Sequence, residues 1–295
     1  MEIINKHLEK HIYFYLILTM ILWGISWPTS KILTTYTDIT TIMFLKFFLS
    51  ALTIIPIIYF LKLKPFFTQT LLKPTFFSLV FLLLYNWFMF YGLKIGTSSL
   101  GGLIVTGTTP IFSFILIAVF YNQIITSKQK LGLSLGLIGT LITLNIFSFS
   151  FEEIFKLENS LFVLASVFWA FVTFFSTQTK DKINSILLTL YLYLISSALI
   201  YIFVIDTTKI IQIFEYDTIF WLNLIYTTII TTGLATTFYF KASNLLGTNL
   251  TASFIFLVPI VAVVSSVIML RESLQIETII GGTILILAIW LINKK

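Results

Sequence analysis

The chain has 295 residues, of which 58% are hydrophobic and only 10% are charged. Soluble domains carry about 25% charged residues, so this composition excludes an ordinary water-soluble protein. The formal net charge of +6 comes from basic residues that are scattered singly between apolar runs. This pattern excludes the basic stripe of a nucleic-acid-binding protein, so no nucleic-acid partner is expected.

Apolar segments of about 20 residues, the length that crosses a bilayer as a helix, follow one another along the whole chain. They are apolar at nearly every position, as in FFSLVFLLL at residues 76–84, whereas the strands of a membrane barrel alternate apolar and polar residues. The predicted fold class is therefore an all-α membrane protein with ten transmembrane helices. The expected spans are residues 12–32, 40–61, 74–93, 98–121, 130–147, 160–179, 185–205, 218–240, 247–270 and 277–292.

The first expected span continues into WPTSKILTTYTD at residues 27–38 without the small-residue cleavage site of a secretory signal. We expect it to remain as a membrane helix. When the loops are assigned to alternate sides of the ten spans, the side that holds both termini carries 12 of the 18 lysines and arginines. Because cytoplasmic loops are enriched in these residues, both termini are expected in the cytoplasm.

The two halves of the chain show the same features in the same order. Gly132 follows Pro110 by 22 residues, and Gly281 follows Pro259 by the same number. The segment LWGISW at 22–27 matches FWAFVT at 168–173, which aligns the first tryptophan of each. We therefore expect two five-helix repeats, residues 12–146 and 159–293. Since five is odd, the second repeat enters the membrane from the opposite side, and such inverted repeats are a transporter architecture with the substrate near the midplane.

Pro110 and Pro259 each lie about a dozen residues into an expected span, which places them near the bilayer centre. A proline inside a helix removes one backbone donor and kinks the helix. Two interpretations are open. The prolines either only kink well-packed helices, as is common in membranes, or act as helix breaks that shape a central cavity.

Aromatic residues at matching depths are the first candidates to line such a cavity. Trp23 and Trp27 are four residues apart and share one face of the first span. Trp169 and Thr173 have the equivalent places in the sixth span. An indole pair related by the repeat would form a platform for a small amphipathic solute, because indole can stack and also donate one hydrogen bond. Simple packing of the two spans is the alternative.

Three polar residues complete the candidate cavity. Asn86 in the third span is an amide that needs partners in lipid, either as glue between helices or as a substrate ligand. Thr109 directly precedes Pro110. The run YTTIITTGLATT at 226–237 is rich in threonine, whose hydroxyls can bond carbonyls of the preceding turn, and Tyr226 is the member expected to face the solute.

Lys46 lies about seven residues into the second span, where a lone ammonium costs at least ~2.5 kcal/mol. It either snorkels to the membrane surface or contacts an anionic group of the substrate. The middles of the expected spans contain no aspartate, glutamate or histidine, and the chain has no cysteine. We therefore expect neither a carboxylate proton relay nor a metal site or other cofactor.

Glycines are concentrated in the fifth and tenth expected spans, at Gly132, Gly136 and Gly139 and at Gly281 and Gly282. Small residues let membrane helices approach closely. The glycines predict that spans five and ten pack together, either within one chain or across the interface of a homodimer.

These motifs together resemble those of EamA-type members of the drug/metabolite transporter superfamily. The resemblance rests on WG at 23–24, FYGL at 90–93, the midspan Pro110, LRES at 270–273 and GG at 281–282. It implies a two-repeat helical bundle that moves metabolites, often amino acids or related compounds, usually outward across the bacterial inner membrane. The turn YNQI at 121–124 and Lys46, where an arginine is frequent, depart from the family pattern.

We therefore expect a multi-pass protein of the bacterial inner (plasma) membrane that carries a small-molecule metabolite by alternating access around a midplane cavity. A membrane-embedded receptor or scaffold, which binds a small molecule without moving it, is the alternative. An intramembrane enzyme is disfavoured, because the spans contain no nucleophile–base set, metal cluster or carboxylate pair.

Overall fold

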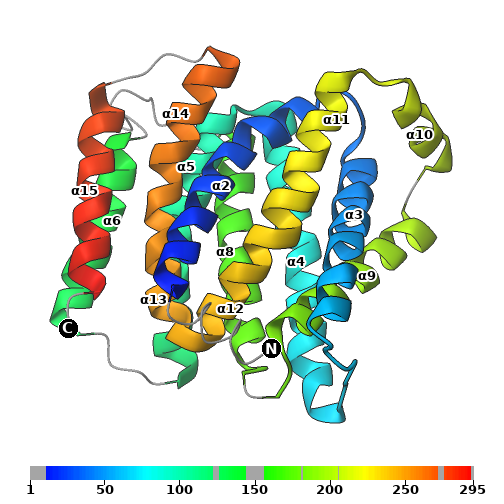
Figure 1. Ribbon diagram of the computed structural model, residues 1–295. Coiled ribbons are helices and arrows are strands. Elements are labelled where there is room, and N and C mark those ends of the chain that lie inside the picture. The colour runs from blue at the N-terminus through cyan, green and yellow to red at the C-terminus, as the bar shows by residue number, and fades with distance from the viewer. Residues whose placement is uncertain are drawn as a thin grey trace.

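The protein is a bundle of helices that run mostly along one direction (Figure 1). The computed structural model describes residues 11–121, 126–143, 156–180, 182–204, 206–271 and 276–293. The first half of the chain forms α2 (Ile12–Leu33), α3 (Ile39–Phe60), α4 (Gln69–Ile95), α5 (Ser98–Tyr121) and α6 (Ser127–Thr143). The second half forms α8 (Leu157–Thr177), α9 (Ser185–Phe203), α10 (Thr207–Gln212), η2 (Ile213–Glu215), α11 (Thr218–Ile225), η3 (Tyr226–Ala235), α12 (Thr236–Leu246), α13 (Thr248–Phe254), η4 (Ile255–Leu257), α14 (Val258–Leu270) and α15 (Ile276–Asn293).

Eight helical segments in the described part of the chain are long and apolar enough to cross a membrane; α11, η3 and α12 form one of them, and α13, η4 and α14 form another. The helices that correspond to the expected fifth and tenth spans are shorter: α6 has 17 residues and α15 has 18. Large apolar side chains such as Phe14, Phe60, Ile202 and Ile268 point outward and are more than half exposed. A surface of this kind is stable in lipid and unfavourable in water.

Polar residues between the helices fix where several of them begin and end. The side chain of Asp38 accepts the N–H of Thr41 at the start of α3, and Asn184 accepts the N–H of Ile186 at the start of α9. These bonds satisfy backbone donors that have no partner inside a helix. At the other end of a helix, the Lys31 ammonium donates to the carbonyls of Leu93 and Gly96 at the end of α4.

The packing pattern stays the same when the two halves of the chain are exchanged. The first helix of the first half, α2, packs on η3 and α14, and the first helix of the second half, α8, packs on the corresponding helices α4 and α5. The second helices of the halves, α3 and α9, pack on each other, as do α6 and α15 at the opposite edge of the bundle (Figure 1). The start of α2 and the end of α15 lie at the same end of the bundle (Figure 1).

Glycines explain why α6 and α15 lie so close together. A Cβ on Gly132 would lie 2.5 Å from Ile292 Cγ1, and one on Gly139 would lie 3.0 Å from the carbonyl oxygen of Gly281. The glycine faces of the fifth and tenth helices are therefore in contact within one chain. This contact covers Gly132 and Gly139, which a homodimer interface through the same face would need.

The second half of the bundle is less regular than the first. The eighth span contains a π-helix, η3, and the ninth contains a turn of 3-10 helix, η4, immediately before Pro259 near the start of α14. A change from 3-10 to α-helical geometry thus lies directly before Pro259. By contrast, α5 continues through Pro110 without interruption. Its packing between α8 and α14 holds the helix together despite the lost backbone donor, so the two matched prolines are not structurally equivalent.

Candidate functional site

A cavity lies at the centre of the bundle, between the two halves of the chain. Its lining side chains come from α2, α3, α4 and α5 of the first half and from α8, α9, η3, α12 and η4 of the second. Its volume of about 60 Å³ is room for a few water molecules. The lining residues are Trp23, Ser26, Trp27, Ser30, Lys46, Phe47, Leu82, Tyr85, Asn86, Met89, Val105, Thr106, Thr109, Trp169, Tyr193, Thr227, Thr231, Thr232, Thr236 and Ile255.

One face of α2 supplies four of these side chains. Trp23, Ser26, Trp27 and Ser30 recur at the three- and four-residue spacing that places side chains on one side of a helix. The indole of Trp27 fits because α5 carries a glycine pair beside it. A Cβ added to Gly101 would lie 2.9 Å from Cζ3 of this indole, too close for a real contact.

Aromatic rings form one wall of the cavity. The indoles of Trp23 and Trp169 meet edge to face with their ring centroids 5.3 Å apart. Tyr85 lies 4.8 Å from Trp169, and Tyr239, which is outside the lining, packs against Trp23 at 4.7 Å (centroid distances). The wall joins the first helices of both halves and has the geometry that aromatic pairs prefer.

A polar pair lies opposite this wall. The ammonium of Lys46 on α3 donates to Oδ1 of Asn86 on α4 at 2.9 Å, and the amide of Asn86 donates to the carbonyl of Leu82 at 2.8 Å. Lys46 is only 8% exposed. Snorkelling of Lys46 to the membrane surface, one of the two sequence interpretations, is therefore wrong for this structure. The side chain turns inward because Asn86 offers it an acceptor across the helix interface.

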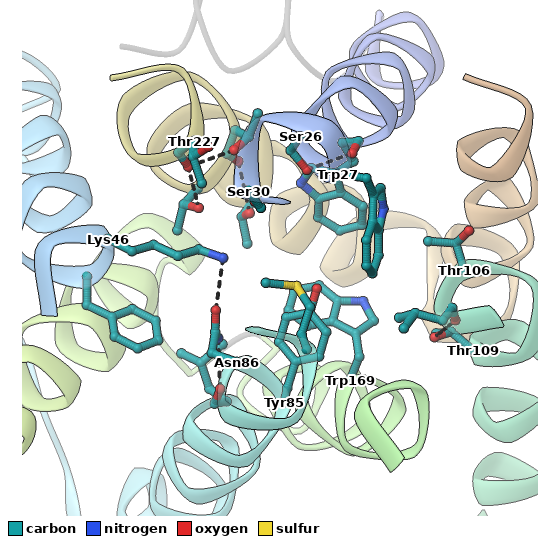
Figure 2. A pocket seen from close by; sticks show the side chains of 18 of the residues that line it. Ser26, Trp27, Ser30, Lys46, Tyr85, Asn86, Thr106, Thr109, Trp169 and Thr227 are labelled. Carbon is teal, nitrogen blue, oxygen red and sulfur yellow. Dashed lines mark hydrogen bonds between the residues drawn. The ribbon is translucent and has the colours of Figure 1, made fainter. Parts of the chain in front are cut away.

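Figure 2 shows how these groups face one another. The ammonium of Lys46 points into the space between Ser30 and Asn86, and the rings of Trp27, Tyr85 and Trp169 lie across the cavity from it. Thr106 and Thr109 lie behind the rings on α5. The hydroxyl of Thr109 donates to the carbonyl of Val105 at 2.6 Å.

The structure brings together five of the seven expected cavity residues, namely Trp23, Trp27, Asn86, Thr109 and Trp169. It places Thr173 one turn beyond the cavity, where its hydroxyl shares a hydrogen bond with the hydroxyl of Tyr239. Tyr226 is also outside the lining and donates to the carbonyl of Leu22.

The threonine-rich segment, which forms the π-helix η3, was expected to turn Tyr226 toward the cavity, but it presents threonines instead. Thr227, Thr231 and Thr232 line the cavity in place of Tyr226. The hydroxyl of Thr231 donates to the carbonyl of Thr227 four residues back, and that of Thr232 donates to the same carbonyl five residues back. Hydroxyls of this segment are thus satisfied by its own backbone, as the sequence also suggested.

Several lining residues were not predicted. Ser26 and Ser30 could have been found, because they share the helical face of Trp23 and Trp27. Tyr85 and Tyr193 give no comparable local signal; burial of Tyr193 depends on its hydrogen bond to the carbonyl of Thr232 on another helix. Within the described residues, no three histidine, cysteine, aspartate or glutamate side chains come together as a metal site would require.

Comparison with known proteins identifies the family of the chain. The EamA-like transporter family matches twice, over residues 10–145 and 156–294. The chain belongs to the EamA-like transporter family. It is therefore a multi-pass membrane transporter and not an enzyme, and the two matches indicate duplicated halves.

Individual relatives agree with this assignment. The uncharacterized transporter YvbV of Bacillus subtilis is 24% identical over 285 residues, which cover 94% of this chain and 89% of the relative. An uncharacterized transporter of Archaeoglobus fulgidus is 27% identical over 199 residues, or 65% of this chain and 67% of that protein. A solved protein structure has a similar fold, with a TM-score of 0.74 at 14% identity over 96% of this chain and 98% of the other.

The LRES motif of the EamA resemblance and the turn YNQI, which departs from the family pattern, are only partly described by the structure. Tyr121 and Arg271 are described, but residues 122–124 of YNQI and residues 272–273 of LRES lie outside the described residues.

Proposed function

We propose that this EamA transporter moves small amphipathic metabolites, such as amino acids or related compounds, through the central cavity by alternating access. The direction we propose is export across a bacterial inner membrane. The observation that carries the proposal is the position of the cavity: both halves of the chain line it, and the first helix of each half contributes an indole to the same wall.

Alternating access in such folds is a rocking of one repeat against the other around a site between them. The halves proposed here are residues 12–146 and 159–293. Exchange-symmetric packing of the helices supports an inverted repeat, as does the location of the start of α2 and the end of α15 at one end of the bundle. We assign that end to the cytoplasm, because the loops on this side carry most of the basic residues.

The short helices α6 and α15 complete ten spans in this proposal. A helix of 17 residues is about 26 Å long, at the lower limit of what crosses the hydrocarbon core. These two helices contribute no residue to the cavity lining. Their glycine-mediated contact gives each half an anchor to the other at one edge of the bundle, away from the substrate path.

The present size of the cavity also supports a moving carrier. Ligand sites for small molecules usually measure about 300–1,000 Å³, whereas this cavity measures about 60 Å³. A metabolite therefore enters only when the lining helices separate. The π-helix and the 3-10 turn in the second half are the irregular segments at which such a change can occur, because irregular turns often mark hinges.

Solute counterflow in reconstituted vesicles tests the proposal. Vesicles preloaded with an unlabelled amphipathic amino acid such as L-phenylalanine should accumulate the labelled compound when they contain the protein. The Trp169→Ala variant should exchange roughly fivefold more slowly, because loss of stacking removes about 1 kcal/mol from substrate binding.

The Trp87→Ala variant is the matched control, since Trp87 is 42% exposed and lies outside the cavity lining. It should exchange like the unaltered protein. Equal exchange by all three proteins would contradict the central cavity as the transport path. Saturable binding of solutes without any counterflow would contradict transport through this cavity.

A further inference from the structure

Lys46 places a basic amine inside the cavity. Its side chain is buried, with only 8% of its surface exposed, and its ammonium faces the cavity (Figure 2). Among the described residues it donates one hydrogen bond, to Oδ1 of Asn86, and it lies 5.2 Å from the ring centroid of Phe90. An ammonium has three donors, so two of them remain for another partner.

No carboxylate of the described residues lines the cavity beside this amine. Among the described residues that line it, Lys46 is the one lysine, arginine or histidine, and none is an aspartate or glutamate. A buried charge is costly unless it is paired and hydrogen-bonded. The partner that is missing from the protein can be supplied by a ligand.

Asn86 holds the ammonium in position for such a ligand. Its amide donates to the carbonyl of Leu82 one turn earlier in α4, which turns Oδ1 toward Lys46. The amide can therefore accept from the lysine but carries no charge that would compensate it. Asn86 is in this sense a positioning residue, and Lys46 is the group that contacts the ligand.

The rest of the cavity fixes what the other end of the ligand is like. Across from Lys46 stand the rings of Trp27, Tyr85 and Trp169 (Figure 2). These surfaces favour an apolar or aromatic body. They contribute no carboxylate that would hold a substrate ammonium.

We propose that the cavity selects organic monocarboxylates, with the carboxylate on the ammonium of Lys46 and an apolar body against the aromatic wall. This inference rests on the proposed function and narrows its substrate class. It implies that an anion binds more tightly than the zwitterion with the same skeleton, because the ammonium of a zwitterion must leave water without an anionic partner in the cavity.

Three probes of almost equal size separate the contributions of charge and shape. Hydrocinnamate is an anion, hydrocinnamamide is its neutral isostere, and L-phenylalanine adds an ammonium to the same skeleton. Binding is measured by titration calorimetry with the purified full chain in lipid nanodiscs. Hydrocinnamate should bind roughly tenfold more tightly than either of the others, because it alone gives Lys46 a charge-assisted hydrogen bond without bringing an unpaired ammonium.

Two variants test whether Lys46 is the cause. Lys46→Gln should weaken hydrocinnamate binding by roughly tenfold or more and leave binding of the amide unchanged. Asn86→Asp keeps the lysine and places a carboxylate beside it, so it should also abolish the preference for the anion while the protein keeps or raises its unfolding temperature. Lys73→Gln, on the exposed start of α4, is the matched control and should bind all three probes normally.

The inference is overturned if the amide binds as tightly as the anion, if hydrocinnamate shows no binding at millimolar concentration, or if Asn86→Asp retains the preference for the anion. The last result remains decisive even where Lys46→Gln does not fold. Failure of the two proposals can be distinguished. Counterflow of a neutral or zwitterionic solute that is independent of Lys46 would leave transport standing, whereas Lys46-dependent binding without counterflow would remove transport alone.

Discussion

Lys46 and Asn86 show how strongly the role of one side chain depends on a neighbouring helix. The sequence placed a lysine in the second span and an amide in the third, 40 residues apart, with no pattern that paired them. Without its neighbour, the lysine could extend to the membrane surface and the amide could bond the preceding turn of its own helix. Because α3 packs beside α4, the lysine instead donates a buried hydrogen bond to the amide and lines the cavity.

Asp217 is a second residue whose environment changes its chemistry, and it lies outside the membrane-spanning segments. It caps α11 by accepting the N–H of Phe220 at 3.0 Å, and it accepts the hydroxyl of Tyr36 at 2.8 Å from the segment after α2. The Phe220 N–H, followed by the Tyr36 hydroxyl, holds the pKa of Asp217 below its ordinary value. The hydrogen bond to Asp217 raises the pKa of Tyr36.

This environment predicts a pH dependence of stability. Because the folded-state pKa of Asp217 is lowered, its contribution is present above the ordinary aspartate pKa of about 3.9 and is lost as the pH falls through and below that value. The unfolding temperature in detergent should therefore fall more between pH 6 and pH 3 in the unaltered protein than in Asp217→Asn. An asparagine still caps the helix but does not titrate, so equal falls in both proteins would contradict the assignment.

Two spans of the second half contain irregular segments, η3 and η4, whereas α8, α9 and α15 in the same half are continuous helices. In η3, hydrogen bonds from Tyr193 and Ser50 reach the carbonyls of Thr232 and Thr228. These bonds from α9 and α3 satisfy carbonyls in the irregular segment, which in lipid have no water to bond. The interruptions therefore depend on the neighbouring helices and not only on the residues within them.

Close helix contacts allow a prediction at the same scale. A Cβ on Gly24 of α2 would lie 2.4 Å from Cβ of Val261 on α14 and 3.1 Å from the backbone nitrogen of Ala262. Because the backbone cannot move aside cheaply, Gly24→Ala should destabilise the protein by about 1–3 kcal/mol. The measurement is the thermal unfolding midpoint of the purified protein in detergent.

Gly282→Ala in α15 is the matched comparison. Its added Cβ would lie 3.1 Å from Cγ1 of Ile260, which belongs to a side chain that can adjust. Alanine also gains up to about 1 kcal/mol of helix propensity over glycine. The unfolding midpoint of Gly282→Ala should be unchanged or slightly higher, and a loss as large as that of Gly24→Ala would show that the α2–α14 contact is not the tighter one.

For the whole molecule, exchange symmetry is the main organising feature. The helices of one half pack on the helices of the other in corresponding pairs, and the cavity lies where the halves meet. The symmetry is not complete, because Lys46 and Asn86 both come from the first half while the irregular helices belong to the second. The amine and the amide of the cavity therefore lie in one half, whereas hydroxyl side chains from both halves line it.

The topology proposed for the ten spans can be tested because the chain contains no cysteine. Single cysteines at Lys128 and Lys180 should react with a membrane-impermeant maleimide only from the cytoplasmic side. A cysteine at Glu215, in the short helical turn between α10 and α11, should react only from the outside. Labelling of all three positions from the same side would contradict the inverted repeat and the cytoplasmic position of both termini.

The sequence by itself determined the class of protein and much of its plan. Continuous apolar runs require lipid and helices, because only a helix or a closed barrel satisfies every backbone group without water. The spacing of prolines, glycines and tryptophans along the chain predicted two similar halves. Trp23, Trp27 and Trp169 were also predicted as cavity residues, because helical periodicity and the internal match placed them at one depth.

The tertiary structure decided which side of each helix faces the cavity. Helices that are apolar all round have no strong preference for one face, so their rotation is set by contacts with neighbours. That is why Tyr226 and Thr173 lie outside the cavity, Tyr85 and Tyr193 lie inside it, and Lys46 points inward. Contacts with neighbouring helices also keep α5 helical at Pro110. Packing on α8 and α14 offsets the backbone hydrogen bond that the proline removes.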